Sequence, residues 1–410
     1  MPYPPYETVC KELDRRRRIA FGFERIEALL KELGDPHRSL QTVQVVGTNG
    51  KGTTAVSLAG ALEAAGHTCG AYLSPHVVSY TERVVLRGRY ASESKFAAAM
   101  WRAIETADAK NIPATQFELL TAGALHLFRE SGVEWAVLEA GLGARHDATS
   151  AAEARAVVLT NVGLDHTEYL GETIEKIAQE KLASLKPGAV LILGTDDPRV
   201  VEVARREAGR AGASIIEHGG RERPDAVAFL PPYLARNVRL GMRVAEVLLG
   251  CALEEGEKEA ASQAVRLLPA RFEEHELCGV PVVVDGGHNP EGLEAALEAV
   301  RSLYRGRPLG VVFGVLREKD VASMLGVLGG EVDALVLTCP VDTSGRALDP
   351  EQVREGHSPR DVRGRMAQVV VNVADALDVA VREMKEAGGV VLVTGSLGTG
   401  AGALGRLRGQ

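Results

Sequence analysis

Short runs of β-branched residues alternate with longer helical patterns along the chain, and this alternation limits most strongly how the chain can fold. In the first half, strand-like runs cover 42–46, 70–73, 135–139, 156–160 and 189–193, with helical stretches such as 53–65 and 172–185 between them. In the second half, such runs cover 280–285, 309–314, 334–338 and 390–394, with helical stretches such as 291–303. Strands that alternate with helices predict parallel sheets flanked by helices. We therefore expect an α/β protein.

Length and a change in the pattern predict two domains. The 410 residues are two to three times a usual domain of about 150 residues. A helical stretch over 232–253 closes the first series, and the acidic segment EEGEKEAAS, expected to be exposed, follows it. A second α/β series then begins. We predict a doubly wound N-terminal domain over 1–269 and a smaller Rossmann-like α/β domain over 270–410.

Charge balance and cysteine usage exclude several classes of protein. The chain has 47 Lys and Arg against 55 Asp and Glu, a net charge of −8, so no nucleic-acid partner is expected. No apolar run approaches the roughly 18 residues of a membrane span, and the N-terminus lacks the apolar core of a signal peptide. The five cysteines are scattered and form no C-x-x-C pair. We expect a cytoplasmic protein without zinc, disulfides or membrane contact.

A glycine-rich loop joins the first strand to the first long helix. The run 43–46 leads into Gly47-Thr48-Asn49-Gly50-Lys51-Gly52-Thr53-Thr54. In such a loop, backbone N–H groups and the helix N-terminus favour phosphate, and Lys51 would neutralise its charge. The strict pattern G-x-x-x-x-G-K-[ST] is not met, because Gly52 follows Lys51. An ordinary turn with a solvated lysine is the alternative, and the strand and helix context favours nucleotide binding.

Polar residues follow three other strands of the first domain. Glu139 ends the run 135–139, Ser74 follows the run 70–73, and Asn161 to His166 follow the run 156–160. Carboxyl ends of parallel strands meet at one edge of a sheet, where a metal could assist phosphoryl transfer. Each position alone is also explained by turn chemistry or a helix cap.

For two further motifs, the sequence pattern alone does not decide between a functional and a structural role. Lys181 ends an amphipathic helical run, where a solvated lysine is the ordinary interpretation. Asp285-Gly286-Gly287-His288-Asn289-Pro290 follows a strand in the second domain and suits either a ligand contact or a turn. The sequence has no G-x-S-x-G and no H-E-x-x-H, so hydrolytic triads and zinc peptidase chemistry have no support. The glycine-rich GSLGTG at 395–400 is expected to be a loop.

An ordered series of motifs resembles the dihydrofolate synthase/folylpolyglutamate synthase family of the Mur ligase superfamily. The motifs are FGFERIEALLKELGDP, VVGTNGKGTT, LSPHVVSYTERV, QFELLTAGAL, LEAGLGARHDATS, TNVGLDHTEYLGETIEKIAQEK, LPARFE, DGGHNP, FGVLREKD, GRALDP and VTGSL. They span nearly the whole chain. The resemblance implies a P-loop doubly wound N-terminal ATPase domain followed by a smaller Rossmann-like ligase domain.

The resemblance also implies roles for particular residues. The phosphates of ATP would be held by Thr48, Asn49, Gly50, Lys51, Gly52 and Thr53. Asn237 would contact the adenine, Arg271 would contact the phosphates, and Asp285 would contact the ribose. His288 and Asn289 are possible contacts of the substrate or of a phosphate. Mg²⁺, in two sites, would be organised by Ser74, Glu139 and His166. Lys181 would be carbamylated, and with Lys51 and His166 it would serve catalysis. The pterin-bearing substrate would contact Thr115, Gln116, Phe117, His146, Asp147 and Ala148.

The reaction implied by the resemblance joins L-glutamate to dihydropteroate, to the γ-carboxylate of reduced folates, or to both, through an acyl phosphate, in a monomeric enzyme. His146 departs from the family pattern, in which leucine is common, and so affects substrate choice. A Mur-type ligase for another carboxylate is one alternative. A P-loop ATPase or phosphotransferase that forms no amide bond is a second, and a non-catalytic scaffold is a third.

Overall fold

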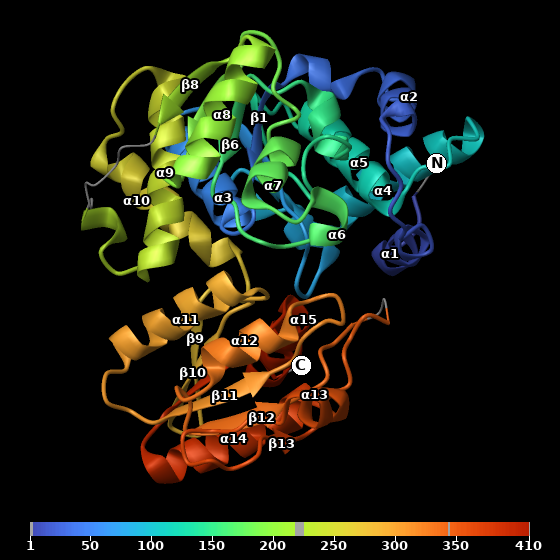
Figure 1. The fold of residues 1–410 in the computed structure, drawn as a ribbon. Helices are drawn as coiled ribbons and strands as arrows, with labels where there is room; N and C mark the ends of the chain where they lie inside the picture. Colours follow the sequence, from blue (N-terminus) through green and yellow to red (C-terminus); the bar gives the residue numbers. More distant parts are fainter. Residues whose placement is uncertain (1–2, 218–224, 343–344, 410) are drawn as a thin grey trace. The chain divides into compact units, whose positions relative to one another are not determined.

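The protein, analysed as a computed structural model, is described over residues 3–217, 225–342 and 345–409. It divides into two compact units, Met1–Leu268 and Pro269–Gln410, which are treated separately (Figure 1).

The first unit contains an eight-stranded sheet. Its strands are β1 (Gln41–Val46), β2 (Cys69–Tyr72), β3 (Val84–Leu86), β4 (Arg89–Tyr90), β5 (Trp135–Glu139), β6 (Ala156–Leu159), β7 (Val190–Leu193) and β8 (Ser214–Glu217). Their order is β4-β3-β2-β5-β1-β6-β7-β8. All pairs are parallel except β2 with β3 and β3 with β4, so an antiparallel edge extends a parallel sheet.

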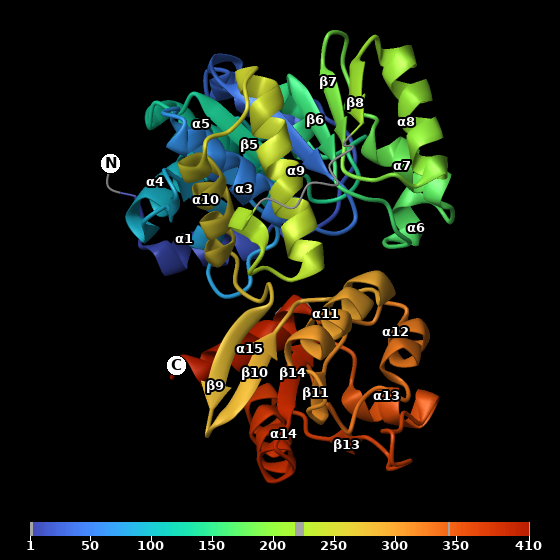
Figure 2. The same ribbon diagram turned by 90° about the vertical axis from the view of Figure 1, so that its left-hand side faces the viewer.

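Helices cover both faces of this sheet. Consecutive residues of β1, whose side chains point to opposite faces, are buried. The helices are α1 (Tyr6–Asp14), α2 (Glu24–Glu32), α3 (Lys51–Ala64), α4 (Glu93–Ala109), α5 (Gln116–Glu130), α6 (Thr167–Leu170), α7 (Ile174–Lys181), α8 (Pro198–Ala211), α9 (Pro232–Leu249) and α10 (Glu255–Gln263). Helix α3 packs against α9 and α10 (Figure 2). One core cluster joins α1, α2, α4 and α5 to β2 and β5, and another joins α7 and α8 to β6 and β7.

The second unit contains a six-stranded sheet in the order β13-β12-β11-β14-β10-β9. Its strands are β9 (Glu273–Leu277), β10 (Val280–Val284), β11 (Leu309–Phe313), β12 (Ala334–Leu337), β13 (Gln368–Val369) and β14 (Val390–Thr394). Its helices are α11 (Pro290–Leu303), α12 (Val321–Leu328), α13 (Pro350–His357), α14 (Val373–Ala387) and α15 (Leu397–Leu407). Among the described strands of this sheet, only β9 runs antiparallel to its neighbour. The predicted α/β class and the two sheets are confirmed.

Two local expectations hold only in part. The acidic segment after α9 is partly or fully exposed over most of its length, as expected, but it forms helix α10 and buries Ala261 and Ser262, because small residues on one face let it pack on α3. The glycine-rich 395–400 is not a loop throughout, because α15 begins at Leu397 and the Ser396 side chain accepts a hydrogen bond from the Thr399 N–H. Among the described residues, no helix combines the length and apolar character that a membrane crossing demands.

Close packing of α9 on α3 predicts that Gly241 cannot be enlarged without cost. A Cβ atom there would lie 2.9 Å from the Leu58 nitrogen and 2.9 Å from the Thr54 carbonyl oxygen. We expect Gly241→Ala to lower the free energy of unfolding by about 1–3 kcal/mol, measured by urea denaturation. The control is Gly209→Ala in α8, where a Cβ meets nothing within 4 Å and helix propensity predicts a gain of about 0.5–1 kcal/mol. Equal stability of the two variants would contradict the packing argument.

Candidate active site

The glycine-rich loop between β1 and α3 is held in place by the segment after β6. The Asn49 N–H donates to Asn161 Oδ1 at 2.8 Å, and the Gly163 N–H donates to Thr48 Oγ1 at 2.9 Å. Gly50 precedes α3 with a φ of 81°, a conformation that suits glycine. The loop therefore presents the N-terminus of a fourteen-residue helix in a fixed conformation, which favours an anion.

Asn237, on α9, lies directly against this loop. A Cβ on Gly50 would be 2.3–2.5 Å from the Asn237 side-chain atoms, so only glycine fits there. The Thr54 hydroxyl also donates to the Asn237 carbonyl oxygen at 3.2 Å. The structure thus brings the predicted adenine residue to the predicted phosphate loop.

Ser74 and Glu139 come together at the carboxyl ends of β2 and β5. The Ser74 N–H donates to Glu139 Oε2 at 2.9 Å, and the same oxygen lies 3.3 Å from the position of a Cβ on Gly52. The Ser74 Oγ atom is buried without a hydrogen-bond partner among the described residues. The pair therefore lies beside the start of α3. Within the described ranges, no three His, Cys, Asp or Glu side chains gather as a ready cluster of metal ligands.

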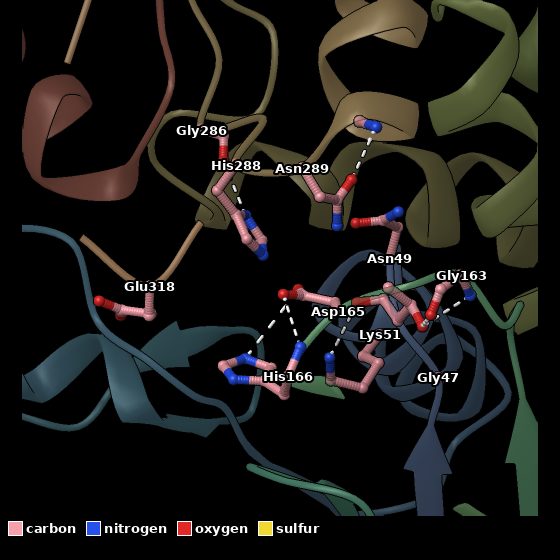
Figure 3. A network of polar contacts seen from close by, with 12 residues as sticks. Gly47, Asn49, Lys51, Gly163, Asp165, His166, Gly286, His288, Asn289 and Glu318 are labelled. Atoms are coloured by element: carbon pink, nitrogen blue, oxygen red, sulfur yellow. Dashed lines mark hydrogen bonds and ion pairs between the residues drawn. The ribbon is translucent and has the colours of Figure 1, made fainter. Parts of the chain in front are cut away.

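His166 lies in the segment after β6, in the left-handed conformation with a φ of 52°, immediately before α6. Its N–H donates to Asp165 Oδ1 at 3.0 Å, and its Nε2 lies 3.9 Å from Asp165 Oδ2 (Figure 3). In the same view Lys51 extends back along the loop, and its Nζ donates to the Thr48 carbonyl oxygen at 3.2 Å. Asp165 was not predicted, although it stands in the same polar run after a strand.

Lys181 is buried at the end of α7, with 5% of the residue exposed, and is not a solvated helix-face lysine. The amphipathic pattern alone missed this, because it cannot tell which neighbour covers the last turn. The Lys181 Nζ donates to the Gly47 carbonyl oxygen at 2.7 Å. Burial, with the nearby Lys51 charge adding to it, lowers the pKa of Lys181 to about 7. Burial therefore favours the neutral form of the Lys181 amine.

Asp147 organises the loop that follows β5. Its carboxylate accepts hydrogen bonds from the N–H groups of Gly141, Leu142 and Thr149 and from the Thr149 hydroxyl, at 2.5–3.0 Å. Complete burial raises the pKa of Asp147, and these hydrogen bonds oppose that rise. A Cβ on Gly141 would lie 2.8 Å from the Phe117 ring and 3.3 Å from Asp147 Oδ2, so Phe117 and Asp147 meet at this glycine.

Thr115 is the N-cap of α5, and Gln116 is the first residue of that helix. Both side chains form hydrogen bonds with other groups of the protein. The Thr115 side chain accepts from the Glu118 N–H, and Glu118 accepts from the Thr115 N–H, which is a capping box. Gln116 Nε2 donates to the Tyr80 hydroxyl at 2.6 Å. Ala148 begins a short 3-10 helix after Asp147. Of the six residues predicted for the acceptor, Phe117 and Asp147 both lie beside Gly141, and Thr115 caps α5.

The predicted residues of the second unit lie at the carboxyl end of β10. The Asp285 carboxylate accepts from the Phe272 and Gly287 N–H groups, both at 2.9 Å, and a Cβ on Gly286 would lie 2.8 Å from an Arg271 guanidinium nitrogen. His288 Nδ1 lies 3.1 Å from the Gly286 carbonyl oxygen, and Asn289 Oδ1 accepts from the Gly292 N–H at 2.9 Å (Figure 3). Asn289 therefore caps α11, and Asp285 stabilises the turn. Arg271 and Asp285 converge on this turn.

The fold and the loop together define an ATP-dependent ligase of the Mur type. Residues 45–226 match the Mur ligase middle domain, and residues 270–397 match the Mur ligase glutamate ligase domain. The dihydrofolate synthase/folylpolyglutamate synthase of Mycobacterium tuberculosis is 31% identical over 95% of this chain and 91% of that protein. The chain belongs to the dihydrofolate synthase/folylpolyglutamate synthase family, as its motifs predict.

Other comparisons show proteins of the same family, and similar solved structures contain nucleotides. A probable bifunctional folylpolyglutamate synthase/dihydropteroate synthase of Haloferax volcanii is 35% identical over 93% of this chain, which spans 48% of that longer protein. The M. tuberculosis folylpolyglutamate synthase complexed with ADP has a TM-score of 0.89 and 30% identity, covering 99% and 98% of the two chains. A bifunctional relative with Mn, AMPPNP and L-glutamate bound has a TM-score of 0.82 and 26% identity, covering 99% and 98%.

The hydrogen bonds of Asp147 predict that its charge is needed for stability. In Asp147→Asn, one oxygen becomes an NH2 group that cannot accept from its backbone donors. We expect the free energy of unfolding to fall by about 2–3 kcal/mol in urea denaturation. Asp108→Asn is the control, because the exposed Asp108 pairs with Arg16 at the surface and such a pair contributes about 0–1 kcal/mol. A loss no larger than that of the control would contradict the role of Asp147.

Proposed function

We propose that this chain ligates L-glutamate to dihydropteroate, to the γ-carboxylate of reduced folates, or to both, with ATP as the phosphoryl donor. The observation that carries the proposal is the fixed glycine loop beside the Ser74–Glu139 pair and the buried Lys181 amine. Membership of the ligase family supports it, and so does the relative with a bound nucleotide analogue, divalent metal and glutamate.

The proposed division of labour follows the two units. Residues 1–269 would bind the ATP phosphates through Thr48 to Thr53 and the adenine through Asn237. Residues 270–410 would contribute Arg271 to the phosphates and Asp285 to the ribose, with His288 and Asn289 as further contacts. The convergence of Arg271 and Asp285 on one turn supports the second assignment.

The residues at the strand ends fit a divalent metal, proposed to be Mg²⁺. Ser74 Oγ is a buried oxygen without a hydrogen-bond partner in the described part of the chain, and the Glu139 carboxylate lies against the Ser74 backbone. Hydroxyl, carboxylate and imidazole from Ser74, Glu139 and His166 would hold it. When bound, the metal neutralises charge on the phosphates of ATP.

Lys181 is proposed to react with CO2 and become a carbamate. The neutral amine is the nucleophile in that reaction, and burial supplies it by lowering the pKa of Lys181 to about 7. The N–C bond forms as one C=O π bond of CO2 opens, the nitrogen loses a proton to solvent, and the product is an anionic group at the position where Nζ now contacts the Gly47 carbonyl oxygen. A carbamate there would place negative charge beside the loop and its cation Lys51.

In the proposed reaction an oxygen of the acceptor carboxylate attacks the γ-phosphorus of ATP. The bond to the β–γ bridging oxygen breaks, giving ADP and an acyl phosphate. The α-amine of glutamate then attacks the acyl carbon, phosphate leaves, the amine loses a proton, and an amide results. Lys51 stabilises charge on the transferring phosphoryl group, and the rigid loop positions it.

The acceptor is the part of the proposal on which the alternatives differ. Phe117, Asp147 and His146 form the proposed end of the acceptor site, and an imidazole replaces the leucine common in the family at position 146. A Mur-type ligase would join an amino acid to another carboxylate. A phosphotransferase would turn over ATP without glutamate. We further propose that the protein is cytoplasmic and that it is a monomer. Sedimentation tests whether it is a monomer.

The decisive experiment measures ADP release with ATP, Mg²⁺ and glutamate, supplying dihydropteroate or a reduced folate separately and identifying products by mass. Glutamate added to both acceptors supports the bifunctional enzyme, and addition to one identifies a monofunctional enzyme. ATP turnover that does not depend on glutamate would refute amide formation. Bound nucleotide with neither product would refute the folate acceptors.

Lys51→Ala is expected to reduce kcat for ligation by at least about 100-fold, because the loop loses the cation that stabilises the transferring phosphoryl group. Ligation is measured by ADP release at saturating ATP. Lys95→Ala, which removes an exposed lysine of α4, is the control and should retain wild-type kcat. Wild-type turnover of Lys51→Ala would refute the assigned role.

Lys181→Ala is expected to lose most ligation activity, and a small carboxylic acid should restore part of it by replacing the carbamate. In the wild type, 13C-bicarbonate should give a carbamate NMR signal that Lys181→Ala lacks. Because the pKa of Lys181 is about 7, the neutral amine and the signal should increase as pH rises through 7. Full activity of Lys181→Ala without added acid would refute the carbamate.

A further inference from the structure

Thr160 and Asn161, directly after β6, bind the backbone of the glycine-rich loop at several points. The Thr48 N–H donates to the Asn161 carbonyl oxygen at 3.0 Å, and the Asn49 N–H donates to Asn161 Oδ1 at 2.8 Å. The Thr160 N–H donates to the Val46 carbonyl oxygen at 2.9 Å. The amides of Thr48 and Asn49 are therefore already bonded within the protein, on the side of the loop that faces the end of β6.

The Thr160 side chain holds the next peptide group of the loop. Its hydroxyl donates to the Asn49 carbonyl oxygen at 2.7 Å, and the Val46 carbonyl oxygen is more distant, at 3.4 Å. A hydroxyl has one proton to donate, and the shorter contact takes it. A Cβ on Gly47 would lie 1.9 Å from Thr160 Oγ1, so the loop packs directly on this buried hydroxyl.

The direction of the Asn49 carbonyl determines the direction of the amide that follows it. In a planar trans peptide, the C=O and the N–H point to opposite sides. Because Thr160 holds the Asn49 oxygen, the Gly50 N–H points away from Thr160. Among the described residues, no acceptor for the Gly50 N–H is found, and no side chain caps α3 at this position. This amide is thus available for an anion.

We propose that Thr160 is a positioning residue of the phosphate loop, which turns the Gly50 N–H towards the phosphates of ATP by holding the Asn49 carbonyl oxygen. The inference rests on the proposed function and adds Thr160, which lies outside the loop itself and outside the proposed metal ligands. Without the hydroxyl, the peptide between Asn49 and Gly50 loses the hydrogen bond from Thr160 and can rotate. A rotated peptide presents its carbonyl oxygen to the phosphate in place of the N–H, and two electronegative groups then repel each other.

The test measures the dissociation constant of AMPPNP with Mg²⁺ by titration calorimetry on the full chain. Thr160→Ser keeps the hydroxyl and Thr160→Ala lacks it, so these two variants differ only in that group. We expect Thr160→Ala to bind AMPPNP about tenfold more weakly than Thr160→Ser, because one charge-assisted hydrogen bond to the phosphates is lost. Thr160→Ser should bind as the wild type does. Thr160→Val, which fills the space of the hydroxyl, should bind as weakly as Thr160→Ala and replaces it if that variant does not fold.

Thr106 provides a matched control in the same unit. Its hydroxyl also donates to a backbone carbonyl oxygen at 2.7 Å, that of Arg102 in α4, and Thr106 is buried as well. Thr106→Ser and Thr106→Ala should therefore bind AMPPNP equally. In steady-state kinetics, Thr160→Ala should raise the KM for ATP and leave the KM for glutamate unchanged, which a general loss of stability would not do.

The outcomes separate this inference from the proposed function. A wild-type chain that binds no AMPPNP refutes the nucleotide site of the proposed function, and this inference with it. A wild type that binds, with equal dissociation constants for Thr160→Ala and Thr160→Ser, refutes the role of Thr160 alone. An equal weakening in Thr106→Ala also refutes that role, because the loss of any buried hydroxyl would then be sufficient.

Discussion

The parallel pairing of β1 with both β5 and β6 is the constraint on which the candidate site depends. Val45 pairs with Glu139 and Val46 with Leu159, so the strands end at nearly the same level. Gly47, Ala140 and Thr160 then begin the three connecting segments side by side. A register change in any of these strands would move a carboxylate, a loop or a hydroxyl away from the others and turn its side chains to the opposite face.

Much of this arrangement could be predicted from the sequence. The β-branched runs end where polar residues begin, so the strand ends at Val46, Glu139 and Leu159 are found within a residue or so. The antiparallel edge of β3 and β4 was not predicted, because its strands are only three and two residues long. Helix α10 was missed because an acidic run hides the small residues that it buries.

Burial of Lys181 is the part that no pattern along the chain could supply. Its helix is amphipathic, and a lysine of such a helix usually lies on the polar, solvated face. What covers it is the loop 134 positions earlier in the chain, through the Gly47 carbonyl. The motif resemblance pointed to Lys181, and only the tertiary contact explains the burial that lowers the pKa of its amine. Asp165 likewise can be recognised as a residue of the site only from the structure, which shows that it lies near His166 and Lys181.

The contact between Gly50 and Asn237 has a consequence for how the protein is made. Thr54, one turn into α3, also bonds the backbone of Asn237, 183 positions later in the chain. A ribosome releases the chain from its N-terminus, so the loop and its helix emerge long before the residue that completes them. Pairing so distant in sequence forms slowly. During synthesis, the apolar surface of α3 therefore stays uncovered until α9 has been made. In this interval the growing chain can aggregate or bind chaperones through that surface.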